Sequence, residues 1–387
     1  MNKEQWQYDT WCANAWGHIA LEPDGNVKPC CYSSDTMGNI KENSFKNIYN
    51  NDFYKKLRLE FLSNNKPSGC FKCWRQEELG VRSLRQISNN RHWAKNVRYN
   101  LKRNTNEDGT IDNVVLHDSD LRFSNKCNMA CIMCSPRFSS KWATELKQEQ
   151  KFFNLFEGKA GNKEFIDQNF DSIKGIYFAG GEPLIMDEHW YILEKLKDYN
   201  KENKIDLRYS TNLSTLTYKN YDIRDYWKNW NGIVEAGLSI DDIDERFDYI
   251  RYGKDWATVE QNIKDILNLD NIIVWVSIAT GFYNILYLKE IMTKLTNIGI
   301  PSKSISLNPV MGELSVHQAP KKLKQDALSL LKELRNIPTL MPAKMSVIEQ
   351  LCKQDPDLHD FTKKLKQIDF RRNTDHLKTF PRLQKYI

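Results

Sequence analysis

Three cysteines within eight residues are the feature of this chain with the most direct chemical meaning. Cys127, Cys131 and Cys134 follow the spacing CxxxCxxC. Three thiolates so close together suit three corners of a cubane iron–sulfur cluster, which usually takes four cysteine ligands, so one iron is left free to bind another molecule. A zinc site is the alternative, but zinc needs a fourth Cys or His nearby, and no His lies between His117 and His189.

A second motif, Gly180-Gly181-Glu182-Pro183, follows a predicted strand at 173–179. Glycine lets the backbone approach a ligand closely, and a glutamate can accept hydrogen bonds from an ammonium group. A glycine pair at a strand end is on its own often only a turn. Taken together, the cysteine triad and this GGEP segment resemble the two motifs of the radical S-adenosylmethionine (SAM) enzymes.

The resemblance implies that SAM binds the open iron of a [4Fe-4S] cluster and is cleaved by an electron to methionine and a 5′-deoxyadenosyl radical. It also implies a reductase or other electron donor, such as flavodoxin or ferredoxin, as a partner. Residues Gly180 to Pro183 are expected to hold the amino group of SAM. By analogy with relatives, further SAM contacts are expected from side chains at strand ends and beside the third cysteine: Met133, Ser210, Asn212, Ser239, Asp241 and Arg251. Strand-end capping, a surface Arg and a core Met are the alternative explanation.

Five more cysteines precede the triad: Cys12, Cys30, Cys31, Cys70 and Cys73. Their order, a Cys, then Gly-x4-Cys, then CxxC, resembles the SPASM and twitch modules that carry auxiliary iron–sulfur clusters. Such a module normally follows the barrel, whereas here it precedes it. No cysteine between Cys73 and Cys127 continues the longer SPASM pattern, so the match is to one cluster, the twitch form.

Five thiols are one more than a single cluster needs. Neighbouring residues on a strand point to opposite faces, so Cys30 and Cys31 are not expected to bind the same cluster. The Gly-x4-Cys spacing favours Cys30, together with Cys12, Cys70 and Cys73. Zinc competes with iron here, because four cysteines that include a CxxC pair also suit a structural zinc site. The sequence alone leaves both the metal and the choice between Cys30 and Cys31 open.

The segment after residue 116 alternates short apolar runs with helix-like stretches. This pattern predicts an α/β fold with parallel strands and helical crossovers, arranged as a partial (β/α)6 barrel. Ligands of such folds collect at the carboxyl ends of the strands, which is where both motifs begin. The predicted strands are 121–124, 173–179, 206–211, 234–240, 272–278 and 304–307, and the predicted helices are 141–156, 187–199, 256–269 and 285–298.

Four regions are expected. Residues 1–85 form a small cysteine-rich module with a hairpin turning at Asp24-Gly25 and a helix over 44–62 that Ser44 caps. Residues 86–115 are polar and basic and resemble a linker. The radical SAM core follows at 116–317, and a helical C-terminal extension interrupted by prolines occupies 318–387.

Composition sets further limits. Of the 387 residues, 27% are charged and 40% hydrophobic, which is ordinary for a soluble globular protein. No apolar run approaches the roughly 18 residues that span a membrane, and the N-terminus has no apolar signal sequence, so we expect a cytoplasmic protein without a membrane partner. Residues 353–387 hold nine Lys or Arg and five Asp or Glu. That excess hints at an acidic partner, although a solvated basic helix face explains it as well.

The expected activity is reductive cleavage of SAM followed by abstraction of a substrate hydrogen. In the resembling families, auxiliary-cluster modules commonly accompany oxidative modification of a peptide, with small molecules also known, so a peptide is the favoured substrate. Radical modification of a nucleic acid or nucleotide is the less favoured alternative, suggested by the basic linker and tail. A non-catalytic iron–sulfur protein with a structural or redox-sensing role is the third. The sequence singles out no catalytic acid or base.

Overall fold

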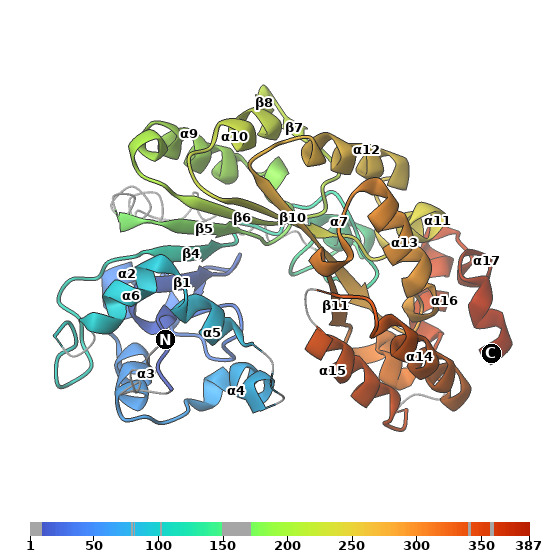
Figure 1. The fold of residues 1–387 in the computed structure, drawn as a ribbon, viewed down its shortest axis with the longest axis horizontal. Coiled ribbons are helices and arrows are strands. Elements are labelled where there is room, and N and C mark those ends of the chain that lie inside the picture. The colour runs from blue at the N-terminus through green and yellow to red at the C-terminus, as the bar shows by residue number, and fades with distance from the viewer. Residues whose placement is uncertain are drawn as a thin grey trace. The chain divides into compact units, whose positions relative to one another are not determined.

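A computed structural model gives the fold of the chain (Figure 1). It describes residues 10–78, 80, 82–100, 103–148, 172–339, 342–356 and 360–387. The chain divides into two compact units. The first unit contains the described residues up to Asn125 and those from 172 to Arg208, and the second contains those from Lys126 to 148 and from Tyr209 to Ile387.

The sheet of the first unit joins the cysteine-rich module to the strand that precedes the triad. Strand β1 (His18–Leu21) pairs in parallel with β4 (Asp118–Leu121), which pairs in parallel with β5 (Gly175–Phe178). Strand β2 (Asn26–Lys28) is antiparallel to β1, and β3 (Gly38–Asn39) is antiparallel to β2. The N-terminal hairpin therefore continues the sheet by backbone hydrogen bonds.

The predicted hairpin and helix cap are present in this unit. Gly25 turns the hairpin with a φ of 88°, which glycine adopts without strain. Ser44 caps α2 by accepting a hydrogen bond from the backbone N–H of Asn47 at 3.3 Å. The helix predicted over 44–62 is two helices, because the side chain of Asn51 caps a second one. The helices are α1 (Asn14–Gly17), α2 (Phe45–Tyr49), α3 (Asp52–Leu62), α4 (Phe71–Glu78), α5 (Leu84–Asn89), α6 (His92–Tyr99) and α9 (Asp187–Glu202).

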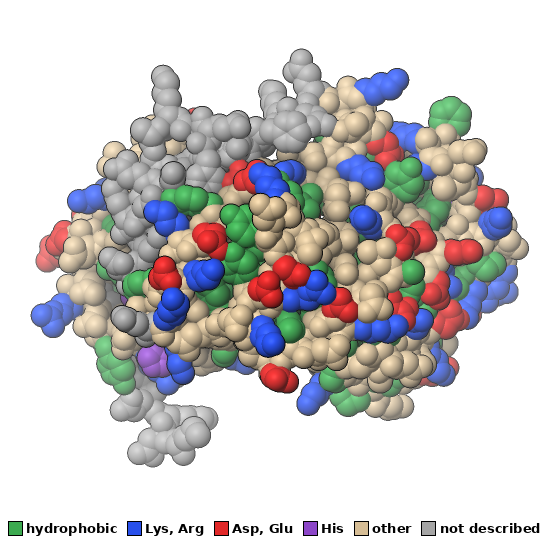
Figure 2. Space-filling model, turned by 90° about the horizontal axis from the view of Figure 1, so that it is seen from above, with side chains coloured by type: hydrophobic (Ala, Val, Ile, Leu, Met, Phe, Trp, Pro, Cys, Tyr) green, Lys and Arg blue, Asp and Glu red, His purple; other side chains and the backbone are tan. Residues whose placement is uncertain are grey.

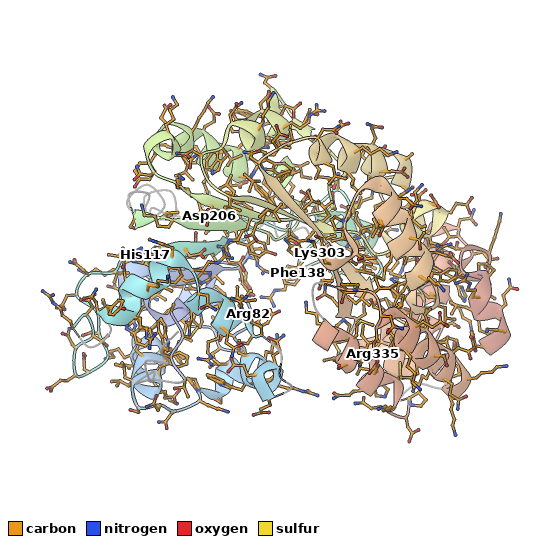
Figure 3. All side chains as sticks on the ribbon, viewed as in Figure 1. Arg82, His117, Phe138, Asp206, Lys303 and Arg335 are labelled. Atoms are coloured by element: carbon orange, nitrogen blue, oxygen red, sulfur yellow. The ribbon has the colours of Figure 1, made fainter. Side chains whose placement is uncertain are left out.

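Two details of the first unit differ from the sequence-based expectation. Helices α5 and α6 lie in the stretch that resembles a linker, and the ring of Trp93 on α6 stacks on His117 at 5.6 Å (His117 is labelled in Figure 3). Strand β4 begins three residues earlier than predicted. Because the strand is mostly polar, a hydrophobic pattern does not reveal its first residues. Its buried Asp118 and Asp120 are tolerated because they pair with Arg208 and Arg122.

The second unit contains the parallel strands β9 (Val234–Ser239), β10 (Ile272–Thr280) and β11 (Ile305–Pro309) and the antiparallel pair β7 (Thr217–Tyr218) and β8 (Tyr221–Asp222). Strand β6 (Asp206–Thr211) runs across the boundary between the units. The crossover helices are α10 (Ile223–Asn229), α11 (Asp244–Ile250), α12 (Trp256–Leu267) and α13 (Leu288–Ile298), and α7 (Ser140–Glu145) follows the cysteine triad. The helix predicted over 141–156 overlaps α7, and its part beyond residue 148 lies outside the described residues.

Strand β10 shows how the second unit divides apolar from polar. Val274, Val276 and Ile278 are buried on one face, whereas Trp275 and Ser277 on the other face are half-buried. The buried face packs among the crossover helices, as the period-2 pattern requires. The prediction of an α/β fold with parallel strands is confirmed, and all six predicted strands are present within a few residues.

The predicted helical extension is also present. It contains α14 (Lys321–Leu334), α15 (Pro342–Cys352), α16 (Lys363–Arg372) and α17 (His376–Thr379), drawn in orange to red in Figure 1. Basic and acidic side chains are interspersed on the face that Figure 2 shows, which agrees with the mild net charge of +6. Among the described residues, no helix combines the length and apolarity needed to cross a bilayer.

Candidate functional site

The triad lies in an irregular segment of the second unit, residues Cys127–Cys134, which we call the cysteine loop. The loop is fixed by backbone hydrogen bonds to the end of α11 and to the segment that follows it. The N–H of Ala130 donates to the carbonyl of Tyr252 at 2.8 Å, and that of Ile132 donates to Ile250 at 2.9 Å. The sulfurs are therefore held on a backbone that has little freedom to move.

Two side chains from elsewhere in the unit hold the loop carbonyls. The indole N–H of Trp142 donates to the carbonyl of Cys131 at 2.7 Å, and Arg372 Nη2 donates to that of Ala130 at 2.7 Å. The indole of Trp142 is buried, as expected of a core tryptophan, and it also binds the loop. The sequence analysis missed Arg372, because nothing in the sequence distinguishes one arginine of a basic helix from another.

The thiols of the loop are in an environment that disfavours charge until a metal or cation compensates it. Cys131 is buried, and Cys127 and Cys134 are half-buried. Burial raises the pKa of Cys131, and burial with the nearby Cys131 raises the pKa of Cys134 to about 12. Arg251 opposes this effect, because its Nη1 lies 3.6 Å from the Sγ of Cys131. Since metals bind thiolates, this arrangement suits a bound cation or cluster.

Arg251 is itself held by Asp241. Its Nη2 lies 2.8 Å from Oδ2 of Asp241, whose Oδ1 accepts the N–H of Ala279 at 2.7 Å. Asp241 is fully buried, and burial raises the pKa of its carboxyl group. Asp241 is thus held between the guanidinium of Arg251 and the backbone N–H of Ala279. Asp241, expected as a SAM contact, is the residue that pairs with Arg251 in the fold.

The amide of Asn212 approaches the first cysteine. Its Nδ2 lies 3.9 Å from the Sγ of Cys127 and donates to Oδ1 of Asn128 at 3.1 Å. Asn128, which the sequence analysis missed, donates in turn to the hydroxyl of Ser214 at 2.7 Å. The remaining expected contacts, Met133 in the loop, Ser210 on β6 and Ser239 on β9, are half-buried.

The GGEP segment forms a tight turn in the first unit. Gly180 has a φ of 114°, and a Cβ there would lie 3.2 Å from the Cβ of Arg122 and from the carbonyl oxygen of Ser124. The N–H of Gly181 donates to that carbonyl at 3.3 Å. Only glycine fits this close approach without strain. The turn is thereby tied to the segment that leads into the cysteine loop.

The rest of the GGEP segment is a short helical turn. Glu182 is 1% exposed, and its Oε1 accepts the N–H of Leu184 at 3.1 Å. Pro183 begins the 3-10 turn Pro183–Ile185, where its missing N–H costs nothing. This geometry leaves the carboxylate of Glu182 fixed in one orientation at the end of β5.

Four of the five N-terminal thiols are gathered in the first unit. Burial raises the pKa of Cys12, Cys70 and Cys73, and it raises that of Cys30 to about 12. Repulsion between neighbouring thiolates raises these pKa values further. The pKa of Cys12 is raised by Cys70 and Cys73, and that of Cys30 by Cys12 and Cys73. The pKa of Cys70 is raised by Cys30 and Cys73. Each of the four therefore lies close to the other three.

Hydrogen-bond donors surround these sulfurs. Backbone groups of Tyr32 and Ser33 bond to the thiol of Cys30, and a backbone group of Arg85 bonds to that of Cys73. Such bonds favour the thiolate and lower the pKa, against the effect of burial. The four thiols, with the hydrogen-bond donors around them, therefore fit a bound metal centre.

Cys31 is directed elsewhere. Burial is the main cause that raises the pKa of this thiol. The second cause is the negative charge of the Asp120 carboxylate, to which the thiol is hydrogen bonded. Asp120 also receives two hydrogen bonds of 3.0 Å from Arg122. The arrangement places Cys30 among the other thiols and gives Cys31 a different main partner, Asp120.

The comparisons with known proteins agree with these features. The model of the radical SAM superfamily matches residues 121–295, and that of the SPASM iron–sulfur cluster-binding domain matches residues 12–74. Residues 121–295 are therefore a radical SAM domain and residues 12–74, which precede it, a SPASM domain, which confirms the predicted family. The first domain type implies a [4Fe-4S] cluster and SAM, and the second implies an additional iron–sulfur cluster.

Individual relatives are distant. GTP 3′,8-cyclase of Campylobacter lari is 26% identical over 149 residues, or 38% of this chain and 39% of that enzyme. The solved structure of histidine-tagged anSMEcpe with bound AdoMet is 15% identical over 58% of this chain and 61% of its own, with a TM-score of 0.42. SuiB of Streptococcus suis bound to S-adenosylmethionine is 12% identical over 74% and 60%, with a TM-score of 0.38. The chain thus spans less than two thirds of each of these proteins.

Proposed function

We propose that this chain is an enzyme that cleaves SAM reductively and removes a hydrogen atom from an unreactive C–H bond of its substrate. The observation that carries the proposal is the surroundings of the cysteine loop. Arg251 lies 3.6 Å from the sulfur of Cys131, and Asn212 lies 3.9 Å from that of Cys127. A purely structural cluster needs neither these contacts nor the tight GGEP turn.

The residues that would hold each cofactor follow from the donor sets. Cys127, Cys131 and Cys134 would hold the catalytic [4Fe-4S] cluster, and Cys12, Cys30, Cys70 and Cys73 the auxiliary one. When bound, the catalytic cluster supplies the electron that cleaves SAM to methionine and a 5′-deoxyadenosyl radical. The GGEP turn would hold the amino group of SAM, with Glu182 as the acceptor.

Arg251 has two tasks in this proposal. Its guanidinium compensates the negative charge of the thiolates in a buried region, where electrostatic interactions are strong. The ion pair with the buried Asp241 fixes the direction of the Arg251 guanidinium. Breaking this pair would leave an isolated buried carboxylate, which costs free energy. The buried indole of Trp142 also holds the cysteine loop through its hydrogen bond to the carbonyl of Cys131.

The match of residues 12–74 to the SPASM iron–sulfur cluster-binding domain favours iron–sulfur over zinc for the N-terminal thiols. Four cysteines would also suit zinc by their chemistry alone.

We propose a peptide as the substrate. The combination of a SPASM domain with a radical SAM domain supports it, since modules of this kind commonly accompany peptide modification. A nucleotide is the second candidate, favoured by the similarity to GTP 3′,8-cyclase over 149 residues. The excess of basic residues at 353–387 also suits an anionic substrate.

The reaction is tested by incubating the anaerobically reconstituted protein with SAM and dithionite. We expect 5′-deoxyadenosine from the wild type, none from Cys131→Ala, and an unchanged yield from Cys352→Ala, a buried thiol outside both cysteine sets. A cluster-loaded wild type that forms no 5′-deoxyadenosine would refute the enzymatic proposal. In that case the non-catalytic iron–sulfur protein would be the remaining candidate.

The substrate class is tested by binding. Affinity for GTP or for tRNA should be measured over a range of salt concentrations, because binding that depends on phosphate contacts weakens steeply with salt. Salt-sensitive binding that is competitive with product formation would favour the nucleotide. Its absence, together with consumption of a peptide from a library and stoichiometric 5′-deoxyadenosine, would favour the peptide.

A further inference from the structure

One arginine of the C-terminal extension, Arg372 at the end of α16, is built into the surroundings of the cysteine loop. Its side chain is only 2% exposed, and its Nη2 donates to the carbonyl of Ala130 at 2.7 Å. The segment that matches the radical SAM superfamily ends at residue 295. A group from outside the matched domain therefore contacts the loop that carries the cysteine triad.

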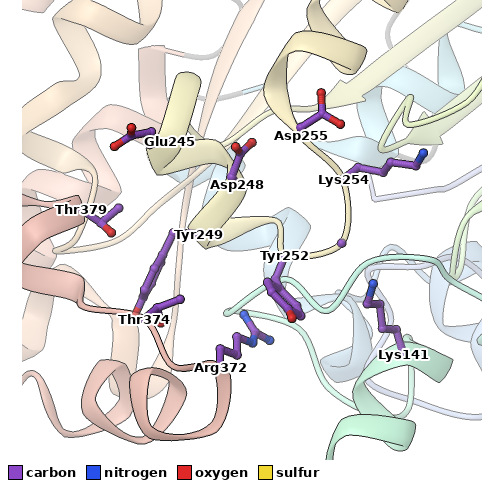
Figure 4. A pocket seen from close by; sticks show the side chains of 11 residues that line it. Lys141, Glu245, Asp248, Tyr249, Tyr252, Lys254, Asp255, Arg372, Thr374 and Thr379 are labelled. Carbon is purple, nitrogen blue, oxygen red and sulfur yellow. The ribbon is translucent and has the colours of Figure 1, made fainter.

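Two aromatic side chains hold the guanidinium of Arg372. Its central carbon lies 4.8 Å from the ring centre of Trp142 and 4.4 Å from that of Tyr252, and a cation over such rings is stabilised. Figure 4, a view of the cavity of about 750 Å³ that Arg372 and Tyr252 both line, shows the guanidinium turned toward the ring of Tyr252. We call Arg372, Trp142 and Tyr252 the arginine clamp.

Each member of the arginine clamp bonds to the loop next to Cys131. The indole of Trp142 donates to the carbonyl of Cys131, and the carbonyl of Tyr252 accepts the N–H of Ala130. Gly253 brings this segment close to the loop, because a Cβ there would come within 2.5 Å of the carbonyl oxygen of Asn128. The positive charge of Arg372 is thus held at a fixed place beside Cys131.

A carboxylate accompanies this charge. Glu145, the last residue of α7, places both carboxylate oxygens 3.2 Å from Nε of Arg372, and one of them 3.0 Å from Nη2. The side chain of Glu145 is 16% exposed, so solvent screens the pair only in part. The charge near the loop is therefore set by a pair of side chains, and removing either one changes it in the opposite direction.

The end of α16 is itself anchored to the segment that holds the loop. Asp369, three residues before Arg372, accepts hydrogen bonds from the hydroxyl of Tyr249 at 2.8 Å and from the backbone N–H of His376 at 2.9 Å. Tyr249 lies on α11, and its neighbour Ile250 accepts the N–H of Ile132 in the loop. The direction of Arg372 is thus fixed by the same helix that fixes the loop.

The charge of Arg372 acts on the sulfur of Cys131. Burial raises the pKa of this thiol, and the positive charges of Arg251 and Arg372 act against that effect. An iron–sulfur cluster gains one negative charge when it is reduced, and nearby charge is one of the factors that set its reduction potential. A cation held beside the loop therefore favours the reduced cluster, and a carboxylate disfavours it.

We propose that Arg372 is a positioning residue that raises the reduction potential of the cluster at the cysteine loop, with Glu145 as the counter-charge that limits the effect. The inference rests on the proposed function, in which the three cysteines of the loop hold a [4Fe-4S] cluster. It gives the C-terminal extension a part in the reaction, because the cation that acts on the cluster comes from α16.

The alternative is that Arg372 only fastens the extension to the rest of the unit. Both explanations predict a loss of stability when the arginine is removed. Only a charge effect predicts that removing Arg372 and removing Glu145 shift the potential in opposite directions, since a loosened loop would act in the same direction in both cases.

The test compares Arg372→Met, Glu145→Gln, the double variant Arg372→Met/Glu145→Gln and Arg372→Lys in the full-length chain. Arg335→Met and Glu349→Gln are the matched controls. They remove the same charges from another ion pair of the extension, with 2.6 Å between Nη2 of Arg335 and Oε2 of Glu349. Circular dichroism checks that each variant folds.

The measured quantity is the reduction potential of the cluster, from a redox titration of the anaerobically reconstituted protein followed by EPR. The variant Cys127→Ala/Cys131→Ala/Cys134→Ala keeps only the N-terminal cysteines, so its signal identifies the auxiliary cluster and is subtracted. Iron and sulfide analysis shows how fully each variant is loaded.

We expect Arg372→Met to lower the potential, so that the ratio of reduced to oxidised cluster at a fixed applied potential falls about ten-fold. Glu145→Gln should raise this ratio by a similar factor. The double variant should lie near wild type, because both charges are gone, and Arg372→Lys should recover most of the loss. The controls should match wild type. Unchanged potentials, or shifts in the same direction in Arg372→Met and Glu145→Gln, would overturn the proposal.

The potential is measured without SAM, so the result does not depend on turnover. Wild type that is loaded with its cluster but forms no 5′-deoxyadenosine would refute the proposed function, while the shifts in potential would still decide the role of Arg372. If Arg372→Met does not retain its iron, Glu145→Gln and Arg372→Lys decide the question. A raised potential in Glu145→Gln with a potential near wild type in Arg372→Lys supports the proposal, and an unchanged potential in Glu145→Gln contradicts it.

Discussion

Arg251 places its Nη1 3.6 Å from the sulfur of Cys131, although the two residues are 120 positions apart in the chain. The same guanidinium is paired with the fully buried Asp241 at 2.8 Å. The cation is thus shared between a carboxylate of the protein and the thiols of the cysteine loop. Any change to Arg251 should affect both the stability of the fold and the chemistry of the loop.

Replacing Arg251 by methionine should destabilise the protein by about 3–5 kcal/mol, because it leaves the buried Asp241 without its cation. Adding Asp241→Asn should restore most of that stability by removing the unpaired charge. The double variant should still form little 5′-deoxyadenosine. Urea unfolding gives the first quantity and chromatography of SAM reaction products gives the second. Full activity in the double variant would show that Arg251 serves only to neutralise Asp241.

Cys30→Ser and Cys31→Ser form a matched pair that tests the auxiliary site. In a background without the three cysteines of the cysteine loop, Cys30→Ser should lose the remaining iron and sulfide, and Cys31→Ser should keep them. The reason is that Cys30 is coupled to Cys12 and Cys73, whereas Cys31 is hydrogen bonded to Asp120, a bond that a serine hydroxyl can replace. Elemental analysis and Mössbauer spectroscopy measure the difference. The opposite pattern would assign the ligand to Cys31.

Gly180→Ala should weaken SAM binding and destabilise the first unit by about 1–3 kcal/mol. The φ of 114° is unfavourable for alanine, and its Cβ would lie 3.2 Å from the carbonyl oxygen of Ser124. Gly80→Ala is a control, because Gly80 also has a positive φ but nothing lies within 4 Å of a Cβ there. SAM affinity is measured by equilibrium dialysis on cluster-loaded protein. Equal affinity in the two variants would remove the GGEP turn from the SAM site.

Lys344→Met should stabilise the protein by about 2 kcal/mol at neutral pH. Lys344 lies on α15 and donates to Oδ1 of Asn308, which in turn donates to Ser277 at 2.5 Å. Burial lowers its pKa from 10.5 to about 8, so charging this amine is costly in the fold. Thermal unfolding of the two proteins provides the comparison. A large loss of stability in the variant would mean that the hydrogen bond to Asn308 outweighs the cost of burial.

The same lysine predicts a pH dependence. Because its pKa is lower in the folded than in the unfolded chain, the cost of its charge is constant below about pH 8 and disappears as the pH rises toward 10.5. The stability advantage of Lys344→Met should therefore shrink over this range and stay unchanged below it. Chemical denaturation of wild type and variant at several pH values measures this difference. A constant advantage up to pH 10.5 would contradict the lowered pKa.

The sequence by itself determined the family, the fold class and the two cysteine sets. The proposed cluster ligands Cys127, Cys131 and Cys134 would have to lie close together, and a short loop achieves this by spacing alone. The GGEP turn is equally local, because its glycines are needed where a strand ends against the backbone. Alternating apolar segments were likewise enough to locate the six strands predicted after residue 116, although β4 begins three residues early because its buried aspartates do not fit a hydrophobic pattern.

The tertiary structure alone decided which distant residues meet these motifs. Arg372 reaches Ala130 across 242 positions, and Asn212 meets Asn128 across 84. The gathering of Cys30 rather than Cys31 with Cys12 likewise depends on how the hairpin continues the sheet through β1 and β4. Such contacts are set by the packing of whole elements, and a sequence pattern carries no information on which arginine of a basic helix faces the core.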